Sequence, residues 1–164
     1  MRVNKFIFAV LMLVSPLAMS IPPPPKVGEI VPNVMGYTLD ENYYQLKYDT
    51  GRIKVVNFFS RACVPCRQEM PELASLEKQY PLIKFISVNT QDEKEPVVSE
   101  FIKKLPAAPS HIIITTGGLQ ETFHPYGLPA TLVLSSKNVV LLSLYGYTPE
   151  NMKLLKIKLR ELSK

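Results

Sequence analysis

The chain has 164 residues, of which 46% are hydrophobic and 20% charged, a composition typical of one globular domain with a sizeable core. Its formal net charge is a mild +5. The basic residues between Lys153 and Arg160 lack the interleaved stacking aromatics of nucleic-acid-binding surfaces. We therefore expect no nucleic-acid partner.

Residues 1–20 have the pattern of an export signal. Arg2 and Lys5 give a positive start, an apolar run follows, and residues 18–20 place small side chains where a signal peptidase reads them. The apolar run is shorter than the ~20 residues that span a bilayer. We predict a signal peptide over residues 1–20, with an uncleaved anchor as the alternative, which would tether the protein to a membrane through residues 6–19.

A proline-rich spacer over residues 21–26 follows, and its four consecutive prolines favour an extended polyproline conformation. Residues 27–164 are predicted to form the single domain. Both a cleaved signal peptide and an uncleaved anchor imply export of the domain, to the periplasm or to the outer face of the cytoplasmic membrane. Thiols tend to be oxidised in such a compartment.

The first part of the domain predicts strands and turns before its first helix. Residues 34–39 and 42–46 alternate weakly around a polar turn, which indicates a hairpin. Residues 54–59 are an apolar run of branched and aromatic side chains, typical of a buried strand. A helical pattern over residues 64–80 and a second apolar run over residues 82–88 complete a strand–helix–strand unit with parallel strands.

The second part predicts a helix from Pro96 to residue 105 and a short strand over residues 111–115. Residues 131–134 and 139–145 are expected to form an antiparallel pair. A last helix begins at Pro149. Its buried stripe is predicted to comprise Met152, Leu155, Leu159 and Leu162.

Two cysteines, Cys63 and Cys66, lie between the first buried strand and the first helix, in the sequence CVPC. The unpaired N–H groups and the dipole at a helix start favour an anion. Cys63 is therefore stabilised there as a thiolate, the reactive form in disulfide exchange. Cys66 lies one turn further and can resolve a mixed disulfide formed on Cys63. The pattern predicts a redox-active pair.

Three other roles for these cysteines remain open. A zinc site would need both histidines, but His111 and His124 are thirteen positions apart, not the four to six of a typical finger. A purely structural disulfide would close a very short loop and contribute little stability. A peroxide-reducing cysteine would suit Ser60, three residues before Cys63, but Val56 stands where such enzymes carry proline. We expect no metal and no bound cofactor.

The order of these elements and several motifs resemble the thioredoxin fold and, within it, the TlpA/ResA group of exported thiol–disulfide oxidoreductases. Residues 27–33 (VGEIVPN) resemble the group's opening motif, residues 54–59 (KVVNFF) its core strand and residues 63–71 (CVPCRQEMP) its active-site helix. Residues 126–131 (YGLPAT) resemble its cis-proline loop. The likeness covers about residues 27–162. It implies an α/β, thioredoxin-like fold: a central mixed sheet flanked by helices, with an N-terminal β-hairpin extension.

The resemblance also assigns roles to matching residues. Pro129 is expected to be cis and to lie beside the disulfide, which leaves the Leu128 backbone free to pair with an extended substrate segment. Glu69 matches an acidic residue close to the cysteines, which raises the thiol pKa or takes the thiol proton. A solvated helix carboxylate is the alternative. Asn57 stands where thioredoxin keeps a buried aspartate, and the TlpA/ResA group often has asparagine there.

One position departs from the family pattern. The group usually carries tryptophan immediately before the first cysteine, whereas this chain has Ala62, preceded by Arg61. The missing ring uncovers the disulfide and widens substrate access, and a cation close to Cys63 would favour the thiolate. Both differences bear on the choice of substrate and not on the chemistry.

The chain is thus predicted to be an exported enzyme that exchanges electrons with thiols and disulfides of other exported proteins. Cys63 attacks and Cys66 releases the product. The resemblance favours the reducing direction, as in cytochrome c maturation, with a membrane-bound electron donor that recharges the pair. A disulfide-forming oxidase and a non-catalytic peptide-binding module of the same fold are the alternatives.

Overall fold

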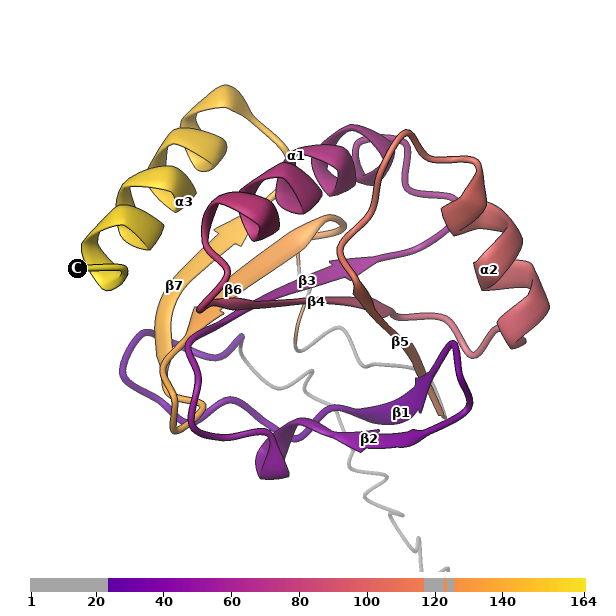
Figure 1. The fold of residues 1–164 in the computed structure, drawn as a ribbon, viewed down its shortest axis with the longest axis horizontal. Coiled ribbons are helices and arrows are strands. Elements are labelled where there is room, and N and C mark those ends of the chain that lie inside the picture. The colour runs from indigo at the N-terminus through magenta and orange to yellow at the C-terminus, as the bar shows by residue number, and fades with distance from the viewer. Residues whose placement is uncertain (1–23, 117–122, 124–125) are drawn as a thin grey trace, which may run out of the picture.

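A computed structural model of the chain describes residues 24–116, 123 and 126–164 (Figure 1). The predicted signal segment and His124 lie outside these residues. No helix in the described ranges combines the length and the apolar character needed to cross a membrane.

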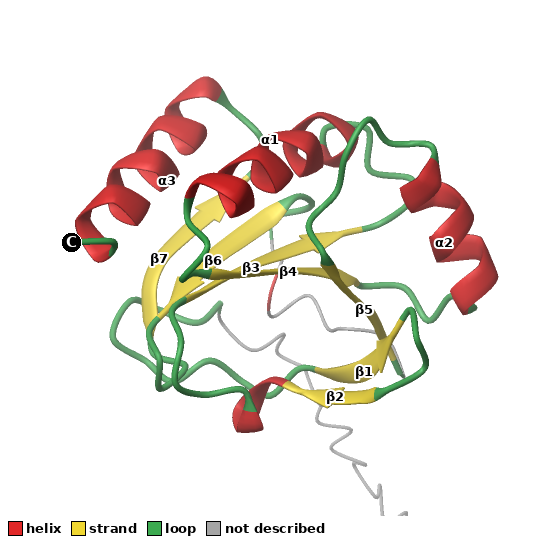
Figure 2. Ribbon diagram, viewed as in Figure 1, coloured by secondary structure: helices red, strands yellow, loops and turns green. Residues whose placement is uncertain are grey.

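The described chain folds into one seven-stranded sheet with three α-helices and a short 3-10 helix (Figure 2). In chain order the elements are β1 (Met35–Thr38), β2 (Tyr43–Gln45), η1 (Leu46–Tyr48), β3 (Lys54–Phe59), α1 (Cys66–Gln79), β4 (Lys84–Asn89), α2 (Glu95–Lys103), β5 (His111–Thr115), β6 (Ala130–Leu134), β7 (Val140–Tyr145) and α3 (Pro149–Leu162).

The strands lie in the order β2-β1-β5-β4-β3-β6-β7, so the sheet is mixed, as predicted. Strands β3, β4 and β5 are parallel, and the pairs β1–β5, β3–β6 and β6–β7 are antiparallel. The predicted hairpin is confirmed as β1–β2, and it extends the sheet beyond β5. The thioredoxin-like fold class is confirmed.

All three α-helices cover the same face of the sheet (Figure 1). The steps from β3 to β4 and from β4 to β5 run in one direction, so two right-handed crossovers place α1 and α2 on one side. Because side chains alternate along a strand, Val55 faces the helices, while Val56 faces a second core on the other side. That second core includes Val34 and Leu46 of the N-terminal segment, together with Phe123.

Several predicted bounds agree with the structure, including those of β3 and β5. Helix α1 begins at Cys66 rather than at Val64, because Val64 and Pro65 form a turn closed by a 3.1 Å hydrogen bond from the Arg67 N–H to the Val64 carbonyl. The helix start therefore coincides with the second cysteine.

Candidate active site

The cysteine pair lies where β3 leads into α1. The Cys63 N–H donates to the Ser60 carbonyl at 3.1 Å, which bends the chain after the strand. Cys63 and Cys66 are joined by a disulfide, with their Cα atoms 5.3 Å apart. The exposed fraction of Cys63 is 8%, whereas Cys66 has none. Cys63 is therefore the sulfur that a substrate can reach.

The start of α1 acts electrostatically on Cys63. The Cys66 N–H, the first of the helix, points at the Cys63 Sγ at 3.2 Å. Pro65 precedes the helix and contributes no side-chain cap, and the Arg67 and Gln68 N–H groups donate to the Val64 and Pro65 carbonyls at 3.1 Å. The Cys66 N–H and the helix dipole stabilise negative charge on Cys63 once the disulfide is reduced.

Glu69 lies three residues after Cys66, on the same buried side of α1. One of its carboxylate oxygens accepts a 2.6 Å hydrogen bond from the Asn57 side-chain amide, and the other accepts a 2.9 Å bond from the Thr131 hydroxyl. The Asn57 amide also donates to the Thr131 hydroxyl at 3.0 Å. A solvated helix carboxylate, the alternative considered from the sequence, is wrong, because only 3% of Glu69 is exposed.

This environment raises the Glu69 pKa to about 7. Burial is the main cause, since it disfavours the charged form, and the nearby Glu72 carboxylate raises the pKa further. The hydrogen bonds from Thr131 and Asn57 act in the opposite direction. A carboxyl group with this pKa can accept or give up a proton at neutral pH.

The loop that contains Pro129 leads into β6. The Leu128–Pro129 peptide is cis, as expected. Leu128 is half-buried and packs against the hydrophobic cluster that contains both cysteines. Strand β6 begins only at Ala130, so the Leu128 backbone lies outside the sheet ladder. Thr131, which binds Glu69, follows two residues after Pro129.

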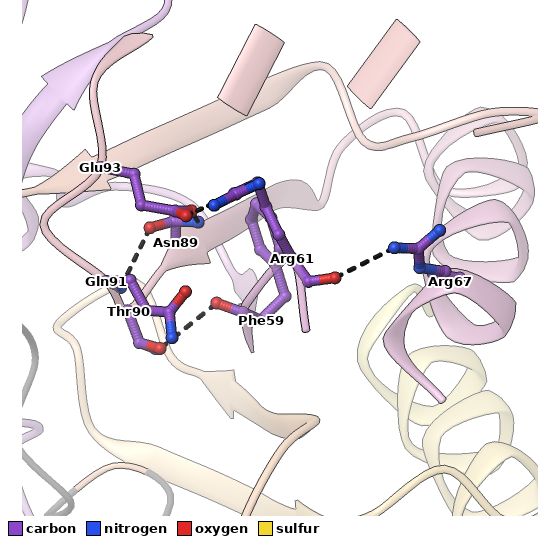
Figure 3. A network of polar contacts seen from close by, with 7 residues as sticks. All are labelled: Phe59, Arg61, Arg67, Asn89, Thr90, Gln91 and Glu93. Carbon is purple, nitrogen blue, oxygen red and sulfur yellow. Dashed lines mark hydrogen bonds and ion pairs between the residues drawn. The ribbon is translucent and has the colours of Figure 1, made fainter. Parts of the chain in front are cut away.

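Arg61 takes part in a polar network that ties the active-site turn to the loop after β4 (Figure 3). Its guanidinium Nε pairs with the Glu93 carboxylate, whose second oxygen accepts a 2.9 Å bond from the Asn89 amide. The Arg61 carbonyl accepts a 3.1 Å bond from Arg67, and the Thr90 N–H donates to the Phe59 carbonyl at 3.0 Å. The cation expected beside Cys63 is thus compensated by Glu93.

No group of three or more histidine, cysteine or acidic side chains that could hold a metal occurs in the described part of the chain. His111 is exposed at the start of β5, and its Nδ1 lies 2.7 Å from the Ser110 hydroxyl. The second histidine of the zinc alternative, His124, is outside the described residues.

The structure also adds residues to which the sequence assigned no role. Thr131 belongs to the YGLPAT motif, but its contact with Glu69 depends on the register that pairs it with Asn57 across β3 and β6. Glu93 sits in a polar turn, where no local pattern distinguishes it from any solvated acid. Only its contact with Arg61 identifies it.

A thioredoxin-like fold with a Cys-x-x-Cys pair at the start of its first helix defines a thiol–disulfide oxidoreductase of the thioredoxin superfamily. The chain belongs to the Redoxin family, which it matches over residues 26–152.

Two curated relatives and one solved structure illustrate the likeness. The thioredoxin-like protein YneN of Bacillus subtilis is 28% identical over 116 residues, which cover 69% of this chain and 68% of the relative. The thiol-disulfide oxidoreductase ResA of Bacillus thuringiensis is 24% identical over 74% of this chain and 70% of its own. The crystal structure of a thiol:disulfide interchange protein DsbE from Chlorobium tepidum shares the fold, with a TM-score of 0.74 and 20% identity over 85% of this chain and 99% of that one.

Proposed function

We propose that the protein is exported and reduces disulfides of other exported proteins, in a role like that of the reductases of cytochrome c maturation. The observation that carries this proposal is the contrast between the two sulfurs. Cys63 keeps 8% of its surface exposed, whereas Cys66 has none exposed and lies on the same side of α1 as Glu69. A two-step exchange needs such an accessible attacking thiol and a sheltered resolving thiol.

In the first step the Cys63 thiolate attacks one sulfur of the substrate disulfide. A mixed disulfide forms, and one substrate thiolate leaves and takes up a proton. In the second step the Cys66 thiol passes its proton to Glu69 and attacks the Cys63 sulfur. The second substrate thiolate leaves, the Cys63–Cys66 disulfide forms, and two electrons have passed to the substrate. The Glu69 pKa of about 7 suits this proton transfer.

The remaining parts of the proposal concern the partners. Leu128 and Pro129 would hold an extended substrate segment beside Cys63, since the Leu128 backbone lies outside the sheet ladder. A membrane-bound electron donor would return the pair to the dithiol. A signal peptide over residues 1–20 would direct the domain to the exported compartment, and an uncleaved segment through residues 6–19 would keep it near the donor.

A trapping experiment tests the exchange and the compartment together. A Cys66→Ser variant, expressed with its own N-terminus, should accumulate mixed disulfides through Cys63 with exported proteins. The matched control, in which both cysteines are serine, should trap none. A module that only binds peptides would keep its partners and trap nothing in either variant, which would contradict the proposal.

The direction of exchange is tested by the equilibrium potential of the pair in a glutathione or dithiothreitol series. A potential near or below about −270 mV, that of thioredoxin, is expected of a reductase. A potential near about −120 mV would overturn the reductase proposal and indicate a disulfide-forming oxidase.

A further inference from the structure

A cavity of about 400 Å³ lies beside the cysteine pair, between the active-site turn and helix α2. Its wall includes Ala62, the residue directly before Cys63. Glu100 and Phe101 of α2 and Lys104 directly after it also line the cavity, as does Arg67 from the first turn of α1. The mechanism above uses none of these side chains.

The Arg67 guanidinium is held in a defined position. Its central carbon lies 5.2 Å from the centroid of the Phe101 ring, and one of its N–H groups donates to the Arg61 carbonyl at 3.1 Å (Figure 3). Phe101 in turn stacks on Phe59 of β3, with ring centroids 5.8 Å apart. Because these two contacts restrain the side chain, binding through it loses less conformational entropy.

Three cations line this cavity, and Arg67 is the one that forms no ion pair in the described part of the chain. Arg61 pairs with Glu93, and Lys104 pairs with Glu100 at 2.6 Å. A guanidinium carries five N–H donors in a planar fork, and the contact with the Arg61 carbonyl uses one of them. The remaining donors suit a carboxylate, which such a fork binds through two parallel hydrogen bonds.

We propose that this cavity is a substrate subsite in which Arg67 binds the carboxylate of an aspartate or glutamate adjacent to the reacting cysteine of the substrate protein. The inference rests on the proposed function, because only a substrate joined to Cys63 brings its neighbouring side chains to Ala62. The small Ala62 side chain, where the TlpA/ResA group usually has tryptophan, occupies little of the space on the way to Arg67. The substrate class is therefore exported proteins with an acidic residue next to a disulfide cysteine.

The test compares the reduction of disulfide peptides that differ in one residue. Two pairs of peptides are used, and the two peptides of a pair differ only in having glutamate or glutamine at one position. This position lies directly before the cysteine in the first pair and directly after it in the second. The rate constant with each peptide is measured for the reduced wild-type protein and for Arg67→Gln, Arg67→Lys and Lys103→Gln. The glutamate-to-glutamine ratio is the readout, since a change in the reactivity of Cys63 itself affects both peptides of a pair equally.

For one of the two pairs, the wild-type protein should prefer glutamate by about fivefold, the upper end expected of a charged contact at an exposed side chain such as Arg67. Arg67→Gln should bring this ratio to about one, and Arg67→Lys should keep part of it, because the charge remains without the planar fork. Lys103→Gln removes a cation of α2 outside the cavity and should leave the ratio unchanged.

Equal rates with both peptides of each pair, or a preference that survives Arg67→Gln, would overturn the subsite and leave the proposed function standing. If the wild-type protein reduced none of the peptides, the proposed function itself would fail, together with the subsite that rests on it.

Discussion

The Asn57 amide donates a 2.6 Å hydrogen bond to the Glu69 carboxylate inside the core, which joins β3 to α1 below the cysteine pair. The carbonyl oxygen of the same amide is buried and has no partner among the described residues. If the amide turned over, this oxygen could accept a hydrogen bond from a protonated Glu69. Asn57 can therefore serve both protonation states of the carboxyl group, as a group that accepts and returns a proton requires.

The first prediction concerns the role of Glu69 as proton acceptor. Glu69→Gln keeps the shape of the side chain but cannot take the Cys66 proton. We expect product release from the mixed disulfide to slow by about 100-fold at neutral pH, a typical contribution of a general base. The first attack by Cys63 should change little. Rapid quenching of single turnovers separates the two steps, and equal slowing of both would contradict this role.

The pH dependence of the same step provides a control. In the wild type, the release rate should rise as pH passes about 7, where Glu69 ionises. Thr131→Val removes a hydrogen bond that stabilises the ionised form, so the Glu69 pKa rises and the inflection moves up by about one pH unit. If the inflection of the release rate with pH did not move in Thr131→Val, or if it persisted in Glu69→Gln, the titrating group would not be Glu69.

The second prediction is that Glu69 makes the oxidised protein less stable as pH rises. Its folded-state pKa is about 7, compared with 4.5 as the ordinary value, so the folded state holds the proton more tightly than the unfolded state. At a pH below the ordinary pKa, Glu69 is protonated in both the folded and the unfolded state, and no stability is lost. Stability falls between these two pKa values, and the full penalty above them is on the order of 3 kcal/mol.

Glu69→Gln has no such titration. The free energy of unfolding of the variant, minus that of the wild type, should therefore rise by about 3 kcal/mol between about pH 4 and about pH 8. Denaturant titrations of the disulfide-bonded wild type and the disulfide-bonded Glu69→Gln variant at the two pH values give this difference. A difference that is constant with pH would show that the carboxyl group is not held in its raised-pKa environment.

The third prediction concerns the charge beside the active-site turn. Glu93 compensates the Arg61 guanidinium, so Glu93→Gln should leave an unpaired cation near Cys63 and increase its thiolate fraction. We expect alkylation of the reduced protein by iodoacetamide to accelerate about threefold at low salt, since the charge is partly exposed and screened. Adding Arg61→Gln to this variant should remove the acceleration. Identical alkylation rates in wild type and Glu93→Gln would refute the coupling.

The fourth prediction tests the docking of the hairpin on the sheet. A Cβ atom on Gly36 of β1 would lie 2.1 Å from the Ile114 carbonyl oxygen of β5, closer than any real contact. Gly36→Ala must therefore push β1 away from β5, and we expect a loss of about 2 kcal/mol or more in the free energy of unfolding. Met35→Ala, at an exposed neighbouring position, is the control and should cost much less. Equal losses in the two variants would argue against this close approach.

Local patterns in the sequence were enough to predict the strands and the position of the cysteine pair. The bounds of β3 and β5 agree with the prediction, because an apolar run that ends at turn residues identifies a buried strand without reference to the rest of the chain. Cys63 and Cys66 lie at the junction of strand and helix for the same reason. A turn and a helix start are decided by residues close together in sequence.

Only the tertiary structure decided what surrounds that pair. Glu69 meets Asn57 and Thr131, which are 12 and 62 positions away, because the register of β3 with β6 sets the two side chains opposite each other below α1. Arg61 meets Glu93 across 32 positions, because β4 lies beside β3. The sequence by itself determined which residues can exchange electrons. The order and register of the sheet, which no local pattern encodes, decided how the Glu69 carboxyl group is buried and which acid pairs with Arg61.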